Sequence, residues 1–121
     1  MFTFDTNILI YLAAGDPKVL NFWTEHRSEI FYVPSIVIAE FLSYPLITSA
    51  AAEKFHDFIR QTIIVNLDYP IAAQAALIRR ETKLSLADAA VAASSMMTHS
   101  SLLTRNIRDF KKVPYLDIIP L

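Results

Sequence analysis

Residues 1–14 read MFTFDTNILIYLAA, and a single carboxylate at position 5 divides this stretch into two parts. We interpret Met1–Phe4 as a short strand that ends at Asp5. The apolar residues of 7–14 run almost without interruption, which indicates a buried helix directly after the strand. The sequence Gly15-Asp16-Pro17 then predicts the end of that helix and the start of another.

The same alternation of strand and helix continues along the chain. Further strands are predicted at Ile30–Val33, Thr62–Leu67, Ser101–Thr104 and Leu116–Ile119. Helices are predicted from Pro17 to about Ser28, at Ile36–Leu42 with Ser35 as cap, at Ser49–Gln61, at Ile71–Lys83, from Ser85 to about His99, and as a short turn at Ile107–Lys111. This order predicts an α/β fold in one domain over residues 1–121, with a central parallel sheet of about five strands flanked by helices on both faces.

Composition supports a single folded domain and excludes several classes of enzyme. The chain has 121 residues, of which 54% are hydrophobic and 19% charged, so disorder is not expected. There is no cysteine, which excludes disulfides, thiolate nucleophiles and zinc–thiolate sites. The single glycine, Gly15, excludes a P-loop, a Rossmann fingerprint and a nucleophile elbow, because each needs at least two glycines.

Charge and hydropathy indicate a cytoplasmic protein without a membrane segment. The apolar N-terminal stretch contains Asp5 and Asn7 and has no preceding Lys or Arg, unlike a secretion signal. The other long apolar stretch, residues 36–52, contains Glu40 and Pro45 and is too short to span a bilayer. The net charge is −1, so a nucleic-acid partner would have to be held by a local basic patch or through bound metal.

Three carboxylates lie in apolar surroundings. Asp5 follows a strand, where ligand sites form in parallel sheets, although it can also simply cap the next helix. Glu40 lies in the apolar segment 36–42, where an ionised carboxylate is costly unless it is paired, bound to metal or turned outward. Asp88 lies in the alanine-rich helix that begins at Ser85, and its capping-box-like spacing also suits the first turn of a helix.

A fourth polar group follows the strand at 101–104. Asn106 or Asp109 can reach the same edge of the sheet, although Asp109 can instead pair with Arg105 or Lys112. Acidic groups after one strand, on one helix and near the start of another form the oxygen-rich set that hard divalent cations prefer. Without a cation, at least one carboxylate of such a cluster would have to protonate.

Four segments, in this order, resemble the PIN-domain ribonuclease family, and in particular the VapC-type toxins of VapBC toxin–antitoxin systems. They are Phe4-Asp5-Thr6-Asn7-Ile8-Leu9, Val37-Ile38-Ala39-Glu40-Phe41, Leu86-Ala87-Asp88-Ala89-Ala90-Val91-Ala92-Ala93 and Leu103-Thr104-Arg105-Asn106-Ile107-Arg108-Asp109-Phe110. The resemblance extends over nearly the whole chain. It implies a parallel sheet with Mg²⁺ or Mn²⁺ at its carboxyl edge, and cleavage of single-stranded RNA or exposed RNA loops.

The resemblance also implies roles for individual residues. Asp5, Glu40 and Asp88 become the metal-binding and catalytic core, and Asp109 is expected to complete the catalytic set. Many members of the family have an aspartate where this chain has Asn106, so the fourth position is held either by Asn106 or by Asp109. Thr6 and Thr104 match hydroxyl positions that support the site in the family.

The expected chemistry is hydrolysis of an RNA phosphodiester by a water that the metal activates. In-line attack would leave a 5′-phosphate and a 3′-hydroxyl. His26, His56 and His99 are far apart in the sequence and are read as surface or packing residues. One cluster of Lys and Arg residues is expected to contact the RNA backbone, and a second cluster could do the same. Both clusters can equally be solvated helix faces or contacts to the antitoxin. The first cluster is Arg105, Arg108, Lys111 and Lys112, and the second is Arg79, Arg80 and Lys83.

Partners and rival functions complete the expectations. The resemblance implies a small antitoxin partner and a homodimer. We expect most of the large aromatic residues to lie in the core; they are Phe22, Trp23, Phe31, Tyr32, Phe55 and Phe58.

The rival enzyme is a phosphatase with Asp5 as covalent nucleophile. Such an enzyme normally has a second aspartate two residues on, where this chain has Asn7. The non-enzymatic rivals are a catalytically weak PIN-like module that binds protein or RNA, which Asn106 favours, and an acidic-pocket regulatory domain.

Overall fold

The computed structural model describes residues 1–121 and contains five strands and seven helices. The strands are β1 (Phe2–Phe4), β2 (Phe31–Pro34), β3 (Ile63–Val65), β4 (Ser101–Thr104) and β5 (Ile118–Pro120). The helices are α1 (Thr6–Ala13), α2 (Pro17–Glu25), α3 (Ser35–Leu42), α4 (Ser49–Ile59), α5 (Tyr69–Thr82), α6 (Leu86–Met97) and α7 (Ile107–Phe110). None of the helices is both long enough and apolar enough to cross a lipid bilayer.

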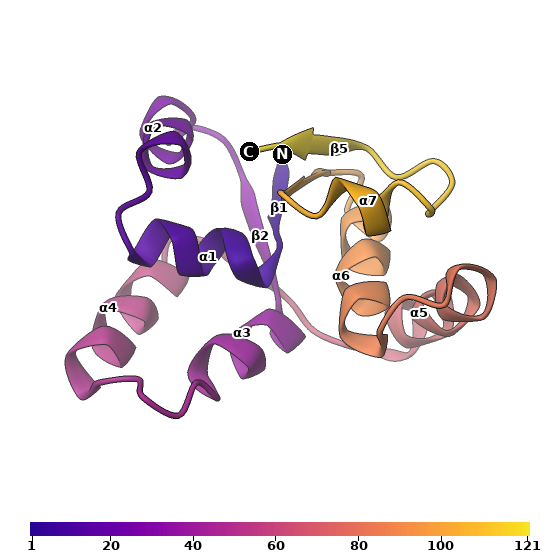
Figure 1. Cartoon of the computed structure of the whole chain (residues 1–121), viewed down its shortest axis with the longest axis horizontal. Coiled ribbons are helices and arrows are strands. Elements are labelled where there is room, and N and C mark those ends of the chain that lie inside the picture. Colours follow the sequence, from indigo (N-terminus) through magenta and orange to yellow (C-terminus); the bar gives the residue numbers. More distant parts are fainter.

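The five strands form one parallel sheet in the order β3-β2-β1-β4-β5. Helices α1–α4 lie on one side of this sheet, and α5 and α6 lie on the other (Figure 1). The predicted α/β fold, with about five parallel strands between two helical layers, is therefore confirmed. The edge strand β3 is shorter than its predicted range, and the edge strand β5 is shifted from its predicted range towards the C-terminus. Each of these strands pairs with a neighbour on one side only, which limits the length over which it is held as a strand.

The helix ends follow local capping chemistry in most places. Asp16 caps α2 by accepting hydrogen bonds from the backbone N–H groups of Lys18 and Val19, and Pro17 is the first helical residue. The predicted cap of α3 is wrong, because Pro34 occupies the N-cap position and makes no side-chain cap. Ser35 is instead the first helical residue, and its Oγ accepts a hydrogen bond from the backbone of Leu67 across 3.1 Å.

Three left-handed backbone positions mark helix ends: Gly15 after α1, Lys83 at the end of α5 and His99, with φ 52°, after α6. Gly15 has φ +79° in the turn between α1 and α2, where a side chain would be strained and glycine is not. Lys83 caps the C-terminus of α5 with φ 62° and ψ 20°, a position that glycine or asparagine usually occupies. A lysine at this position therefore carries a conformational cost that glycine would avoid.

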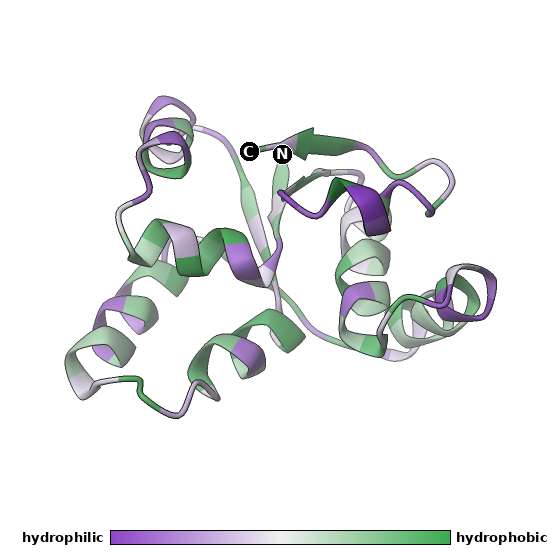
Figure 2. Cartoon of the chain, viewed as in Figure 1, coloured by the Kyte–Doolittle hydropathy of each residue, from purple (hydrophilic) through white to green (hydrophobic).

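The two sides of the sheet are packed differently. On the α1–α4 side, Phe4 stacks on Phe31 at 5.1 Å between ring centroids, and Trp23 packs edge-on against Phe31 at 4.8 Å. On the other side, α6 buries a run of small residues, from Ala89 to Ser95. The strands are mostly hydrophobic in Figure 2, as expected of strands covered on both faces. The aromatic residues expected in the core are buried (Trp23, Phe31 and Phe55) or partly buried (Phe22, Tyr32 and Phe58).

Candidate metal centre

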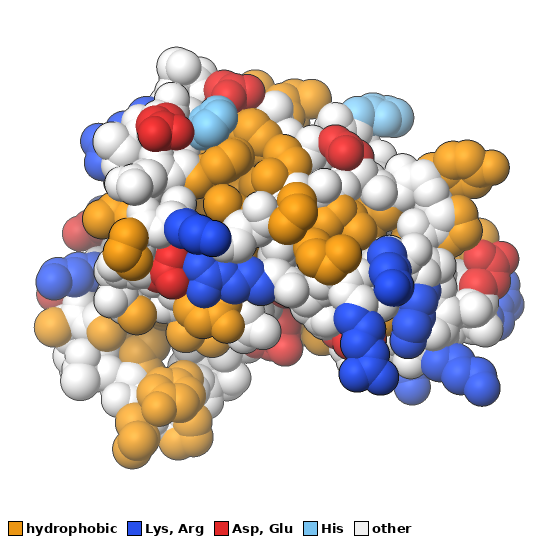
Figure 3. Space-filling model, turned by 45° about the horizontal axis from the view of Figure 1, so that its top comes forward, with side chains coloured by type: hydrophobic (Ala, Val, Ile, Leu, Met, Phe, Trp, Pro, Cys, Tyr) orange, Lys and Arg blue, Asp and Glu red, His pale blue; other side chains and the backbone are white.

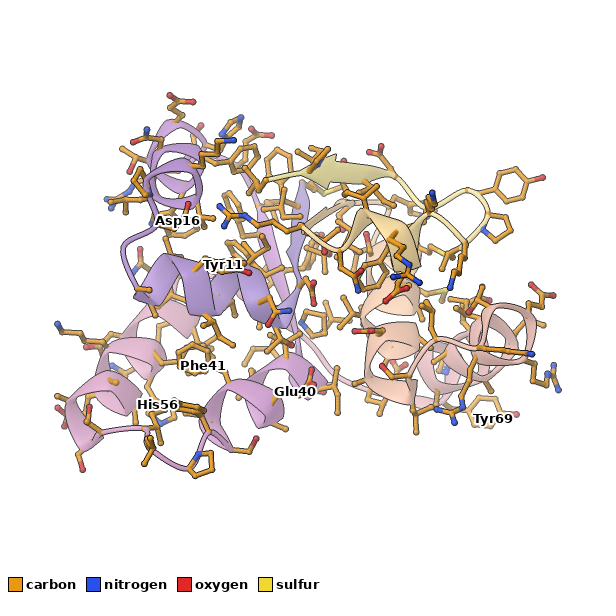
Figure 4. The ribbon with its side chains drawn as sticks, viewed as in Figure 1. Tyr11, Asp16, Glu40, Phe41, His56 and Tyr69 are labelled. Carbon is orange, nitrogen blue, oxygen red and sulfur yellow. The ribbon has the colours of Figure 1, made fainter.

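The predicted acidic residues come together at the carboxyl edge of the sheet. Asp5 lies directly after β1, and its backbone N–H donates to the carbonyl of Leu103 in β4. Glu40 projects from α3 towards α6 (Figure 4), and Asp88 lies in the first turn of α6. The strands place Asp5 at the centre of this edge, because β1 is the middle strand of the sheet.

Asp5 is buried, with 5% of its surface exposed. Its Oδ2 accepts a 2.8 Å hydrogen bond from the hydroxyl of Thr104, at the end of the neighbouring strand β4. Burial raises the pKa of Asp5 to about 6; the Thr104 hydrogen bond opposes this rise, and the charges of Asp88 and Glu40 add to it. Although Asp5 occupies the N-cap position of α1, its side chain does not cap the helix. Of the two readings open from the sequence, simple capping of α1 by the Asp5 side chain is therefore not what the structure shows.

Glu40 has different surroundings from those that its apolar segment suggests. Only Val37 in α3 is buried, and Glu40 itself is exposed. The hydroxyl of Thr6, in the first turn of α1, donates a 2.7 Å hydrogen bond to Oε1 of Glu40. Of the alternatives open for Glu40, the structure shows a side chain that is turned outward and bonded to a threonine, whereas the carboxylate that is buried is Asp5. Helix α3 is apolar because Ile36, Ile38, Phe41 and Leu42 pack against the core, while Glu40 lies on its exposed face.

Asp88 is half-buried between these two extremes. Its backbone N–H donates to Oγ of Ser85, so Ser85 caps α6 as predicted. Burial raises the pKa of Asp88, and the negative charges of Glu40 and Asp109 raise it further. The pKa of Asp88 is thus affected both by Glu40 and by Asp109, so Asp88 lies between the Asp5–Glu40 part of the site and the segment after β4.

That segment contains both candidates for the fourth position, and they contact one another. Nδ2 of Asn106 donates to Oδ2 of Asp109 across 3.1 Å, and the backbone N–H of Asn106 donates to Oγ1 of Thr104. Lys112 forms an ion pair with Asp109 at 3.7 Å, which is one of the two pairings considered from the sequence. Asn106 thus orients Asp109, while Thr104 connects this segment to Asp5.

Arg105 does not join the other cations. Its Nη2 lies 2.8 Å from Oδ1 of Asp16, its Nε donates to the carbonyl of Leu121, and its guanidinium lies 4.2 Å from the ring centre of Tyr11. The same guanidinium lowers the pKa of Asp16. Tyr11 and Asp16 are both labelled in Figure 4. Sequence reasoning missed these partners, since Asp16 lies 89 residues away and no local pattern connects it to Arg105.

The chemistry of the donor set fits a hard divalent cation. No three His, Asp or Glu side chains are already arranged around a common point that could hold a metal ion. Asp5, Glu40 and Asp88 nevertheless act on one another through their charges, and two of them have raised pKa values. A cation with a preference for oxygen ligands relieves this repulsion. His26 is remote from these carboxylates, stacking on Phe22 with Nδ1 2.8 Å from that residue's carbonyl oxygen.

Comparisons with known proteins agree with this fold. The family model described as PIN domain matches residues 2–115. A toxin–antitoxin complex from Klebsiella pneumoniae contains a similar chain, with 25% identity over 98% of this chain and 96% of that one, and a TM-score of 0.82. VapBC2 from Rickettsia felis, bound to a promoter DNA fragment, is similar at 20% identity over 99% and 98% of the two chains, with a TM-score of 0.86. DNA-bound VapBC from Salmonella typhimurium gives 20% identity, coverage of 98% and 96%, and a TM-score of 0.86. No curated protein sequence matches the chain.

Proposed function

The chain belongs to the PIN domain family, and from that premise we propose that it is a metal-dependent endoribonuclease and the toxin of a toxin–antitoxin pair. The observation that carries the proposal is the buried carboxylate of Asp5, hydrogen-bonded to Thr104 and within the field of Glu40 and Asp88. A fold has no structural need to bury a carboxylate with a raised pKa beside two others. A site for a divalent cation gives this arrangement a purpose.

Asp5, Glu40 and Asp88 are the residues that would hold Mg²⁺ or Mn²⁺. Such a cation makes a water molecule a better nucleophile near neutral pH and offsets the charge that develops on a phosphodiester during hydrolysis. Asp5 must lose its proton to act as a ligand, and its pKa of about 6 allows this at neutral pH. Asp109 lies next to this set and is the proposed fourth carboxylate, oriented by Asn106.

Thr6 and Thr104 are proposed to position these ligands. Thr104 donates to Oδ2 of Asp5, which leaves Oδ1 free of that hydrogen bond. Thr6 donates to Oε1 of Glu40 and restricts a side chain that is otherwise exposed. In both pairs a hydroxyl holds one carboxylate oxygen, so the other oxygen is the natural ligand for the cation.

A protein partner is part of the proposal. The similar chain from Klebsiella pneumoniae comes from a toxin–antitoxin complex, and the Rickettsia and Salmonella structures are VapBC assemblies bound to DNA. We expect this chain to pair with a small antitoxin protein and to form a homodimer.

The rival function is a PIN-like binding module with little turnover. It is favoured by the surroundings of Asp109, whose two oxygens contact Asn106 and Lys112 and so are partly neutralised. If Asp109 stays with these partners, the site has three carboxylates rather than four and binds metal more weakly.

End-labelled structured RNA, incubated with purified protein and Mg²⁺ or Mn²⁺, separates these functions. The wild type is expected to cleave the RNA and leave 5′-phosphates, and both EDTA and Asp5→Asn are expected to abolish the cleavage. Lys54→Gln is a matched control, because Lys54 is an exposed side chain of α4 outside the carboxylate cluster. Intact RNA across many substrates, from protein that circular dichroism shows to be folded, would favour the binding module.

A further inference from the structure

Six of the eleven Lys and Arg residues lie in two short segments that flank the carboxylates on one side. We refer to these six residues as the basic strip, and all of them are exposed: Arg79, Arg80 and Lys83 at the end of α5, and Arg108, Lys111 and Lys112 in and after α7. Figure 3 shows Lys and Arg side chains gathered at the lower right of the molecule. Within residues 79–83 and 108–112 the only acidic residues are Glu81 and Asp109.

Both halves of the basic strip border the candidate metal centre. Lys83 lies two residues before Ser85, which caps the helix that carries Asp88. Lys112 pairs with Asp109 at 3.7 Å, and the charge of Asp109 acts on Asp88. The strip therefore begins where the acidic cluster ends, so a polyanion held at the carboxylates through a cation can continue directly onto it.

Most cations of the strip are free for a ligand. Lys112 is the only one of the six that forms an ion pair within the chain. Arg60 and Arg105, outside the strip, are by contrast paired with Asp57 and Asp16. Unpaired, clustered cations repel one another, and a polyanion removes that repulsion.

The opposite side of the site has a different character. The groove between α1, α3 and α4 is lined mainly by apolar side chains, among them Ile10, Phe41 and Leu46. Lys54 is its only cation. A nucleic-acid backbone that leaves the carboxylates therefore meets clustered positive charge on the α5–α7 side and a single lysine in the groove.

We propose that the basic strip binds the phosphate backbone of single-stranded RNA, so that the substrate passes from the carboxylates across the end of α5 and α7. The proposal rests on the proposed nuclease function. It changes the set of RNA-contacting residues expected from the sequence: Arg105 is left out because Asp16 holds its guanidinium, and Arg79, Arg80 and Lys83 are added. Contacts of this kind give affinity without a choice of sequence, and they make binding depend on salt.

Lys83 allows a test in which stability and binding change in opposite directions. Its left-handed backbone, at φ 62°, suits glycine better than lysine. Lys83→Gly is therefore expected to leave the melting temperature unchanged or higher while it weakens RNA binding. If Lys83 served only the fold, its replacement would change the melting temperature and leave RNA binding unchanged.

The experiment measures the anisotropy of fluorescein-labelled single-stranded RNA of mixed sequence in EDTA, in an Asp5→Asn background that prevents turnover. Lys83→Gly and the double variant Arg79→Gln, Arg80→Gln are compared with Lys18→Gln and Lys54→Gln, two exposed cations outside the strip. Each strip variant is expected to weaken binding several-fold. It should also flatten the slope of log K against log salt by about 0.7 for each phosphate that the variant no longer neutralises. The two controls should keep both the affinity and the slope of the background.

Strip variants with unchanged affinity and slope would overturn the proposal. So would tighter binding of polyglutamate than of the RNA at equal charge concentration, with the difference lost in the strip variants, because the strip would then be a site for an acidic polypeptide. The nuclease function is judged separately, by metal-dependent cleavage in the wild type. Cleavage without any effect of the strip would leave that function intact, whereas absence of cleavage would remove the function and not the measured RNA affinity.

Discussion

The candidate site contains two carboxylate–threonine pairs, and their surroundings differ. In one pair Thr104 donates to Asp5, and both residues are buried at the end of adjacent strands. In the other, Thr6 donates to Glu40 on the surface between two helices. The buried pair keeps its position at a cost, because burial raises the pKa of Asp5 to about 6. The exposed pair can rearrange when a ligand arrives. In the proposed metal centre, Asp5 would therefore be a fixed ligand, and Glu40 a ligand that can adjust its position to the cation.

The largest expected effect comes from Asp5→Asn, which should abolish cleavage and yet stabilise the metal-free fold. The folded-state pKa of Asp5, about 6, lies above its ordinary value of 3.8, so ionisation of Asp5 opposes folding. The difference in stability should be absent below about pH 4, grow as the pH rises to about 6 and stay constant above it. At pH 7 we expect Asp5→Asn to be more stable by up to ~3 kcal/mol.

Urea denaturation in EDTA, at several pH values between about 4 and 8, measures this difference. A constant stability difference across that range would show that the buried carboxylate carries no ionisation cost. It would then remove the contrast between the two pairs.

Divalent metal is expected to reverse the cost at Asp5. Mn²⁺ at about 100 times its dissociation constant should raise the stability of the wild type by ~2.7 kcal/mol. Asp5→Asn should show almost none of this rise, since its amide cannot supply the same charge. Differential scanning calorimetry with Mn²⁺ and then excess EDTA tests this. Equal shifts in the two proteins would place the bound metal away from Asp5.

The two threonines provide a matched comparison. Thr104→Val removes the hydroxyl that donates to Asp5 and accepts from the backbone of Asn106, so a loss of ~2 kcal/mol is expected. Because the Thr104 hydrogen bond lowers the pKa of Asp5, its removal should also shift the acid limb of the cleavage profile to higher pH. Thr6→Val removes one exposed hydrogen bond and should cost less than ~1 kcal/mol.

For both variants, urea denaturation measures the free energy of unfolding, and cleavage rates between about pH 5 and 8 give the pH profile. Equal losses of stability, or an unchanged pH profile in Thr104→Val, would contradict the assignment of Thr104 to the buried pair.

The smallest effect on stability is expected from Glu40→Gln. Glu40 is exposed, so replacing its charge should change the free energy of unfolding by less than ~0.5 kcal/mol. Cleavage should nevertheless fall steeply if Glu40 is a ligand. Chemical denaturation and the RNA assay, run on the same preparation, check this. A variant that keeps full activity would remove Glu40 from the metal centre.

Much of the fold was predictable because it is recorded in local patterns. The strand that ends at Asp5, the stop at Gly15 and the caps at Asp16 and Ser85 each depend on residues within one or two turns of chain. Ser35 was an exception, since its hydroxyl accepts from Leu67, 32 residues away. Capping patterns cannot report such a partner, because the contact exists only after β2 and β3 pair.

The residues proposed for the site were named from the sequence, but their surroundings and interactions could not be predicted from it. The apolar segment around Glu40 left burial and exposure open, and the packing of α3 exposes that side chain. From the sequence Asp5 could equally have been a helix cap, and its side chain instead accepts a hydrogen bond from a hydroxyl 99 residues away. Asn106 and Asp109 were considered as alternatives, yet they contact one another directly.

The sequence by itself determined the order of strands and helices, the position of Asp5 at the end of a strand and the oxygen-rich set of residues proposed for the site. Only the tertiary structure decided that Asp5 is buried while Glu40 is exposed, and that Arg105 binds Asp16 rather than joining the other cations. The physical reason is range. Periodicity and capping act over a few residues, whereas burial and ion pairing depend on which distant segments the packed sheet brings into contact.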